Sequence, residues 1–153
     1  MAGKKFLIIF FIFVLIVWIV DFRKSTSLNQ DIDSGYQTKD LFLGNEILNV
    51  DIADTDEKRT LGLSGRNELN DRGMIFIFED EAIRGFWMKD MLVSIDIVWI
   101  DSDGVILHIE NNISPDSYPD VFQPNVPAKY VLETSANYTV EKGIQLGDKI
   151  ENL

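Results

Sequence analysis

The chain has 153 residues, of which 14 are Lys or Arg and 25 are Asp or Glu, and its formal net charge at pH 7 is −11. This length accommodates one ordinary domain and a short additional segment. Because the chain has no cysteine, disulfides, thiolate metal sites and a lipidated-cysteine anchor are excluded.

The first predicted element is a membrane anchor. Every residue from Phe6 to Val20 is apolar, and basic residues stand on both sides of the run. At 1.5 Å per residue the run is shorter than a bilayer core of about 30 Å, so flanking residues would have to complete the span. A cleaved secretory signal is the alternative, but the sequence DFRKSTS after Val20 lacks the small residues of a cleavage site. We therefore predict an uncleaved signal anchor at residues 1–24, with secretion after cleavage as the alternative.

Residues 25–40 are polar and predict a flexible tether, followed by one β domain at residues 41–153. Four of the basic and one of the acidic residues lie within residues 1–24, so residues 25–153 carry a net charge of about −14. Such a surface repels nucleic-acid phosphates and anionic lipid headgroups. The sequence thus predicts no nucleic-acid partner and contact with the bilayer only through residues 6–20. We expect a cytoplasmic N-terminus and an extracytoplasmic domain.

Short apolar runs then alternate with turn signals, which is typical of a mainly β domain, a small β-sandwich or barrel. The predicted strands are 46–53, 74–78, 85–88, 95–100, 105–110 and 129–133. Gly44-Asn45 predicts a tight hairpin between residues 40–43 and the strand at 46, and the turn at 101–104 predicts another.

Two short helices are predicted among the strands. Asp54 is predicted to cap the first, with Glu57 completing a capping box and Gly62 ending the helix. Ser135 is predicted to cap the second, which Gly143 would end.

All four prolines fall in one loop, between the predicted strands at 105–110 and 129–133. Proline restricts its own backbone and that of the preceding residue, so the loop is long but has little conformational freedom. It is either a rigid crossover or a lid over a pocket.

The segment GFWMKDM, at residues 85–91, places charges directly after an apolar run. If it is a strand, its two-residue period directs Phe86 and Met88 to one side and Trp87 and Lys89 to the other. The lysine stem can then lie on the indole ring while its ammonium group reaches an anion.

Two interpretations of Lys89 remain open. In the functional one, Lys89 binds an anion or handles a proton, with help from Arg66 in the preceding loop. In the structural one, Lys89 closes the end of the barrel through an ion pair with one of three carboxylates: Asp90, Asp96 or Glu133.

Several segments, in this order, resemble the uncharacterised DUF192 family. They are Gly62-Leu63 with Arg66, GMIFIF at 73–78, FWMKDM at 86–91, IDIVWIDSDGVI at 95–106, VLE at 131–133, Gly143-Ile144 and Gly147-Asp148. The resemblance covers about residues 47–150 and implies a small β-sandwich or barrel with one or two short helices, commonly secreted or anchored, with no established enzymatic activity. The family pattern FWMKNT has asparagine and threonine where this chain has Asp90 and Met91. The added carboxylate would weaken an anion site and strengthen an ion pair.

Other chemistry is weakly supported, and we predict no catalytic residue, metal or cofactor. His108, the single histidine, lies in a predicted strand, and the sequence has no nucleophile elbow. Asp101 and Asp103 resemble part of a calcium loop, but the position of its last glutamate is Asn112.

Three functions are consistent with these observations. The first is a membrane-tethered binding or accessory module for a small anionic or saccharide ligand, with a candidate site at Arg66, Trp87, Lys89, Asp90, Asp96 and Glu133. The second is a cell-envelope glycan hydrolase that uses Asp96 and Glu133 as a carboxylate pair, which would require a separation of about 5 to 9.5 Å. The third is a purely structural or protein-interaction module.

Overall fold

The computed structural model describes residues 35–153, and Tyr36–Leu153 form one compact unit. The anchor predicted at residues 6–20 lies outside the described residues. Within the described part, no helix has the length and apolar character needed to cross a membrane.

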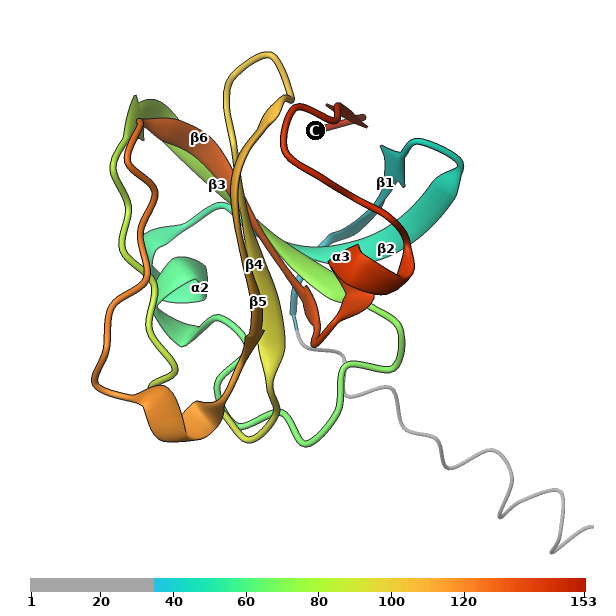
Figure 1. The fold of residues 1–153 in the computed structure, drawn as a ribbon. Helices are drawn as coiled ribbons and strands as arrows, with labels where there is room; N and C mark the ends of the chain where they lie inside the picture. Colours follow the sequence, from blue (N-terminus) through green and yellow to red (C-terminus); the bar gives the residue numbers. More distant parts are fainter. Residues whose placement is uncertain (1–34) are drawn as a thin grey trace, which may run out of the picture. The chain divides into compact units, whose positions relative to one another are not determined.

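The described residues form one seven-stranded sheet in the order β5-β4-β6-β3-β2-β1-β7, drawn in Figure 1. Its strands are β1 (Thr38–Leu43), β2 (Glu46–Ala53), β3 (Gly73–Ala82), β4 (Ile95–Ile100), β5 (Ile106–Ile113), β6 (Ala128–Ser135) and β7 (Ile150–Glu151). Neighbouring strands are antiparallel except β2 and β3, which are parallel. The mainly β class and both predicted hairpins are confirmed. β1 begins within the segment predicted as a tether.

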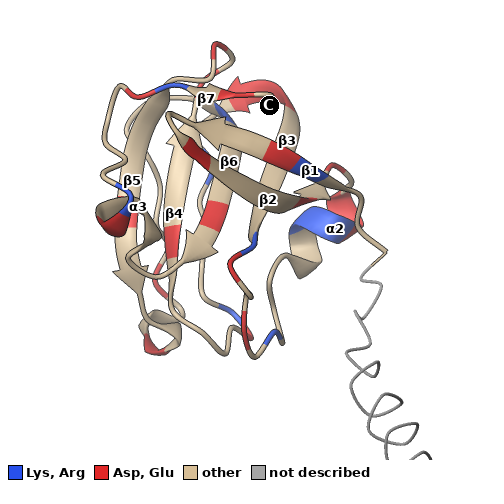
Figure 2. Cartoon of the chain, turned by 90° about the vertical axis from the view of Figure 1, so that its right-hand side faces the viewer, with Lys and Arg blue, Asp and Glu red and all other residues tan. Residues whose placement is uncertain are grey.

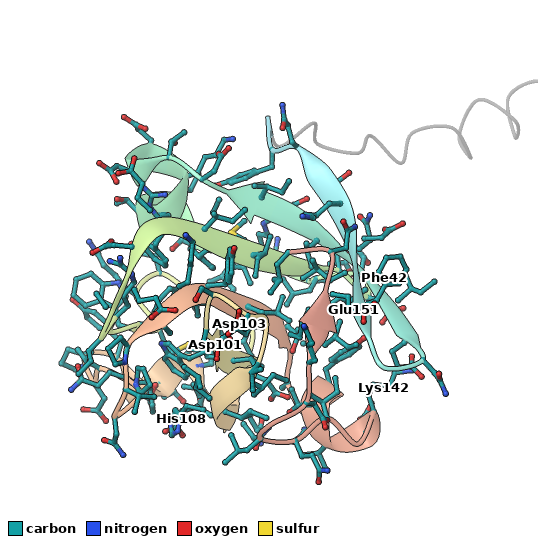
Figure 3. All side chains as sticks on the ribbon, turned by 90° about the horizontal axis from the view of Figure 1, so that it is seen from above. Phe42, Asp101, Asp103, His108, Lys142 and Glu151 are labelled. Carbon is teal, nitrogen blue, oxygen red and sulfur yellow. The ribbon has the colours of Figure 1, made fainter. Side chains whose placement is uncertain are left out.

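The sheet curls into a half-barrel. The segment that contains β7 pairs with β1 at one end of the strand order and contacts the residues just before β5 at the other end. On one side Glu151 pairs with Phe42 of β1, and Figure 3 shows these two residues side by side. On the other side the backbone N–H of Ile150 donates to the carbonyl of Gly104, just before β5, at 2.8 Å. Gly104 has φ +84°, and a Cβ there would lie 2.5 Å from the Ile150 carbonyl oxygen. This close approach requires glycine.

Helix α2 (Asp56–Leu61) forms where the sequence predicts it, but its N-cap is Thr55. The Thr55 hydroxyl accepts a hydrogen bond from the backbone N–H of Lys58 at 3.3 Å. Asp54, the predicted cap, is instead ion-paired with the Lys58 ammonium group at 2.7 Å. Gly62 ends the helix with φ +53°, as predicted.

Helix α3 (Tyr138–Glu141) also forms, but the predicted cap, Ser135, is the last residue of β6. The N-cap residue is Asn137, whose side chain makes no capping hydrogen bond. The carboxylate of Asp96 accepts hydrogen bonds from the backbone N–H groups of Asn137 at 2.8 Å and Thr139 at 3.0 Å. A side chain on β4 therefore caps this helix, and the local sequence cannot reveal that.

Asp96 is fully buried, and its remaining contacts join further elements. Oδ1 also accepts from the backbone N–H of Asn112 at 2.8 Å, and Oδ2 accepts from the Thr139 hydroxyl at 2.6 Å. One carboxylate thus holds together β4, the end of β5 and the start of α3.

Both faces of β4 are covered, and all six of its residues are buried. Ile97 and Trp99 pack into one hydrophobic cluster and Val98 and Ile100 into another. Figure 1 shows α2 and α3 on opposite sides of this strand. We call the side with Ile97 and Trp99 the α2 face and the other the α3 face.

Residues 83–94, which we call the crossing segment, run over the α2 face. The strand predicted at 85–88 does not form: only Phe86 makes a β-bridge, with Phe122 of the proline-containing loop. The segment is held to the sheet instead, since the indole N–H of Trp99 donates to the carbonyl of Arg84 at 3.0 Å. The predicted alternation of side chains is nevertheless present, because Met88 is buried while its neighbours on either side are exposed.

We expect the substitution Asp96→Asn to lower the free energy of unfolding by about 3 kcal/mol, because an amide NH₂ would face buried N–H donors that now have a charged acceptor. The measurement is urea denaturation of a fragment comprising residues 35–153. Asp101→Asn is the matched control. In Asp101 one oxygen, Oδ1, accepts hydrogen bonds from the N–H groups of both Asp103 and Val105. Asparagine retains this acceptor oxygen. Equal losses in the two variants would contradict this role of Asp96.

Candidate functional site

A cavity of about 510 Å³ lies on the α2 face, between α2, β3, β6 and the crossing segment. We call it the α2 cavity. Its aromatic and charged lining residues are Phe76, Phe78, Phe86, Trp87, Asp56, Arg59, Arg84, Lys89 and Glu133. None of its lining residues comes from the proline-containing loop, so this loop is not a lid over the cavity.

The aromatic walls are positioned by packing with one another. The Phe86 ring meets the Phe76 ring edge-on, with centroids 4.9 Å apart. Trp87 is 56 % exposed, and its ring lies 6.4 Å from that of Tyr118. Because most large aromatic side chains in a fold this small fill its core, an exposed tryptophan beside a cavity offers a face for a ring-shaped ligand.

Two of the cavity's cations are already compensated by carboxylates. The Arg59 guanidinium is ion-paired with Asp56 at 2.7 Å, and the Arg84 guanidinium with Asp80 at 2.5 Å. Arg84 also stacks on the Phe78 ring at 3.9 Å. Figure 2 shows acidic and basic residues next to each other along α2.

Lys89 differs from these arginines. It is exposed and, within residues 35–153, forms no ion pair with Asp90, Asp96 or Glu133. With Trp87 it lines both the α2 cavity and an adjoining hollow of about 590 Å³. Lys89 is therefore available to a ligand at the place where the two hollows meet.

Asp90 lies in the adjoining hollow and outside the α2 cavity. Its φ is +57°, and its carbonyl accepts a hydrogen bond from the backbone N–H of Gly65 at 2.8 Å. Asparagine and aspartate tolerate this left-handed conformation better than other residues with a side chain. The replacement of the family's asparagine by Asp90 therefore preserves the turn.

Arg66 lies outside the lining of the α2 cavity. Its guanidinium is 2.7 Å from the carboxylate of Asp51, to which Arg72 also donates a hydrogen bond, and it lies 5.7 Å from the Tyr36 ring. Asp51 is only 1 % exposed. Asp51 was not among the predicted site residues, because β2 also carries Glu46 and Asn49, and the two arginines follow only after α2.

Glu133 is a buried carboxyl group in the α2 cavity. It is 4 % exposed, and its Oε2 has no hydrogen-bond partner. Burial raises the pKa of Glu133 to about 8, and the nearby Arg66 guanidinium opposes this rise. The carboxyl group is therefore mainly uncharged at neutral pH, and it can donate as well as accept a hydrogen bond.

The structure does not bring Asp96 and Glu133 together. In the register between β4 and β6, Glu133 pairs with Ile97 and Asp96 pairs with Thr134. Since consecutive residues of a strand point to opposite faces, Glu133 lies on the α2 face and Asp96 on the α3 face. Their carboxyl groups cannot flank one glycosidic bond in a shared cavity.

The remaining candidates lie away from the α2 cavity. His108 is 3.0 Å from Glu110 on the same strand. Figure 3 shows Asp101 and Asp103 together in the β4–β5 turn, where Asp101 accepts from backbone N–H groups. Among residues 35–153, no group of three or more His, Asp or Glu side chains is placed to hold a metal ion.

Comparison with known proteins gives a family match and several relatives. The model of DUF192, described as an uncharacterized ACR, matches residues 41–152. A UPF0127 protein of Pyrococcus abyssi is 32 % identical over 107 residues, which are 67 % of this chain and 84 % of that protein.

Two solved structures are similar. A protein of Sinorhizobium meliloti 1021 described as a putative transcription regulator has a TM-score of 0.71 and 30 % identity, covering 76 % of this chain and 94 % of its own. A protein of unknown function from Novosphingobium aromaticivorans has a TM-score of 0.72 and 28 % identity, covering 77 % of this chain and 87 % of its own.

We expect Glu133→Gln to change how stability depends on pH. Because the pKa of Glu133 is raised in the folded state, its contribution is complete below about pH 4.5 and is lost as the pH rises towards 8. The native protein should lose on the order of 1.4 kcal/mol per pH unit through this window, and the glutamine variant should not. Urea denaturation of residues 35–153 at pH 5.5 and pH 8.5 measures the difference.

The matched control is Glu81→Gln. Glu81 is an exposed carboxyl group whose pKa is lowered by its hydrogen bond with Ser102. Its contribution is present at both pH values and is lost only in acid, so this variant should shift stability equally at pH 5.5 and pH 8.5. A Glu133→Gln variant with the same pH dependence as the native protein would show that Glu133 titrates normally.

Proposed function

The chain belongs to the DUF192 family, and we propose that its domain is a binding module that takes a small anionic or saccharide ligand into the α2 cavity. The volume of about 510 Å³ is within the range of small-molecule sites. The proposal rests mainly on the environment of Lys89. This lysine is exposed, forms no ion pair with any described residue of this acidic domain, and lines the cavity together with Trp87.

The chemistry of the cavity supports a ligand with a ring and an acidic or hydroxyl group. Phe86 and Trp87 provide aromatic surfaces on which the apolar face of a sugar ring can pack. Lys89 provides charge, and Glu133 provides a buried polar group beside the aromatic rings. A few polar groups among apolar surfaces are typical of ligand sites.

The sequence supports a location for this module. Residues 6–20 anchor the chain in a bilayer, with the N-terminus in the cytoplasm and the domain outside it. The acidity of residues 25–153 keeps the domain away from anionic lipid headgroups and from nucleic acid. For this reason we do not extend to this chain the description of the Sinorhizobium meliloti protein as a putative transcription regulator.

A protein-interaction module is the second candidate, and exposed apolar side chains near the cavity favour it. Leu61 is 56 %, Ile83 53 % and Trp87 56 % exposed, and all three line the α2 cavity. An apolar rim of this kind also suits a protein surface. The ligand-binding module requires the charge of Lys89 for binding an acidic sugar, whereas the interaction module does not.

We expect Lys89→Gln to weaken the binding of an acidic disaccharide, cellobiouronic acid, about tenfold, since one charge contact at a partly exposed site is worth roughly 1 kcal/mol or slightly more. The binding of neutral cellobiose should change little. Isothermal titration calorimetry of the full chain in detergent micelles measures both affinities. Because Lys89 has no ion pair in residues 35–153, the melting temperature should stay within a few degrees of the native value.

Lys129→Gln is the matched control, because it removes the same charge from a half-buried lysine outside the α2 cavity. If the two variants bind the acidic disaccharide equally well, Lys89 has no special role. If neither sugar binds the native protein, the ligand-binding proposal is wrong, and the apolar rim would then favour the interaction module.

A further inference from the structure

The two buried carboxyl groups on the central strands differ in their environment. Asp96, on the α3 face, accepts hydrogen bonds from backbone and hydroxyl donors of two other elements, β5 and the start of α3. Glu133, on the α2 face, is almost as deeply buried, yet its Oε2 has no partner. Buried polar groups in native proteins are nearly always hydrogen-bonded, and exceptions occur at functional sites. Glu133 lines the α2 cavity, so a ligand in that cavity can supply the missing partner.

We propose that Glu133 selects the ligand of the α2 cavity, by donating a hydrogen bond from its unpartnered Oε2 to an oxygen of an acidic saccharide whose carboxylate is held by Lys89. This inference rests on the proposed binding function and specifies its ligand class. It assigns Glu133 a role in recognition and assigns no catalytic step.

The charged groups around Glu133 come from several surrounding elements. They are Arg66 of the 62–72 loop with its partner Asp51 of β2, Arg59 and Asp56 of α2, Arg84 and Lys89 of the crossing segment, and Asp80 of β3, the partner of Arg84. Each of the three arginines is paired with one of these carboxylates, so within the described residues Lys89 is the cation of this set that has no ion pair. An ammonium group entering the cavity would be repelled by Lys89, whereas a carboxylate would be attracted by it. The surroundings therefore favour an acidic over a basic ligand.

The protonation state of Glu133 fits the same ligand. Burial raises its pKa to about 8 even though Arg66 favours the ionised form. An uncharged carboxyl group offers an O–H donor to a ligand oxygen, and it does not repel a ligand carboxylate. When Glu133 ionises, it loses the donor and adds a negative charge inside the cavity. Binding of an acidic saccharide must then weaken as the pH rises above about 8.

The test compares three disaccharides that share a ring system: cellobiouronic acid, cellobiose and the dimer of glucosamine. Their affinities for the full chain in detergent micelles are measured by isothermal titration calorimetry at pH 6, 7, 8 and 9. At pH 6, where the amine of the glucosamine dimer is charged, we expect the acidic sugar to bind most tightly, the neutral sugar more weakly and the amino sugar not measurably. Affinity for the acidic sugar should fall towards tenfold per pH unit above pH 8.

Glu133→Gln separates recognition from folding. Glutamine keeps a donor at this position and does not titrate, so the variant should bind the acidic sugar at pH 6 and retain this affinity at pH 9. Glu151→Gln, at an exposed carboxyl group on β7, is the control and should keep the native pH dependence. The native loss of affinity between pH 8 and pH 9 must therefore disappear in the first variant alone.

Three results would overturn the inference. If the amino sugar binds best at pH 6, where its amine is charged, Glu133 acts as a carboxylate counter-ion. If the acidic sugar binds through Lys89 but with the same pH profile in native protein and Glu133→Gln, the binding function stands and the role of Glu133 is wrong. If no disaccharide binds the native chain at pH 6, both proposals are wrong.

Discussion

The sheet's central strands are covered on both faces, and this constraint governs every polar side chain that they carry. The carboxyl groups of Asp96 on β4 and Glu133 on β6 are almost completely shielded from bulk water, so their desolvation must be offset by nearby donors, or the group becomes protonated. On the α3 face the donors are backbone N–H groups at the start of α3, and Asp96 uses them. On the α2 face there is a cavity instead, and Glu133 is left unpaired. The same constraint thus produces a structural carboxylate and a candidate recognition group in adjacent strands.

The crossing segment forms one wall of the α2 cavity and so places further side chains near Glu133. It is not a strand, and its path is fixed by contacts with remote parts of the domain: Trp99 holds Arg84, and Phe122 bridges Phe86. Gly85 permits the approach, because a Cβ there would lie 2.5 Å from a methyl carbon of Val121. The segment can therefore bury Met88 while it leaves Trp87 and Lys89 exposed at the cavity.

Much of the fold could be predicted from the sequence, because strand patterns, the two hairpin turns and Gly62 at a helix end are local signals. Contacts between distant residues could not be predicted. The strand pattern at 85–88 was misleading because alternation of buried and exposed side chains also arises in a segment that packs on a sheet without joining it. The same spacing predicted that Trp87 and Lys89 lie on one side of the segment, and both line the α2 cavity. The separation of Asp96 from Glu133 depends on the register between β4 and β6, which neither strand specifies alone.

The half-barrel is completed by residues synthesised last among those described here. The side-chain amide of Asn152 donates to the carbonyl of Asp40 at 2.7 Å, across 112 positions, and β7 covers the free edge of β1. While the ribosome is still adding the preceding residues, that edge has no partner and can pair with the edge of another nascent chain. The interval between synthesis of β1 and arrival of β7 is thus the period in which this domain is most exposed to misassembly, and a chaperone that shields β1 would act during that interval.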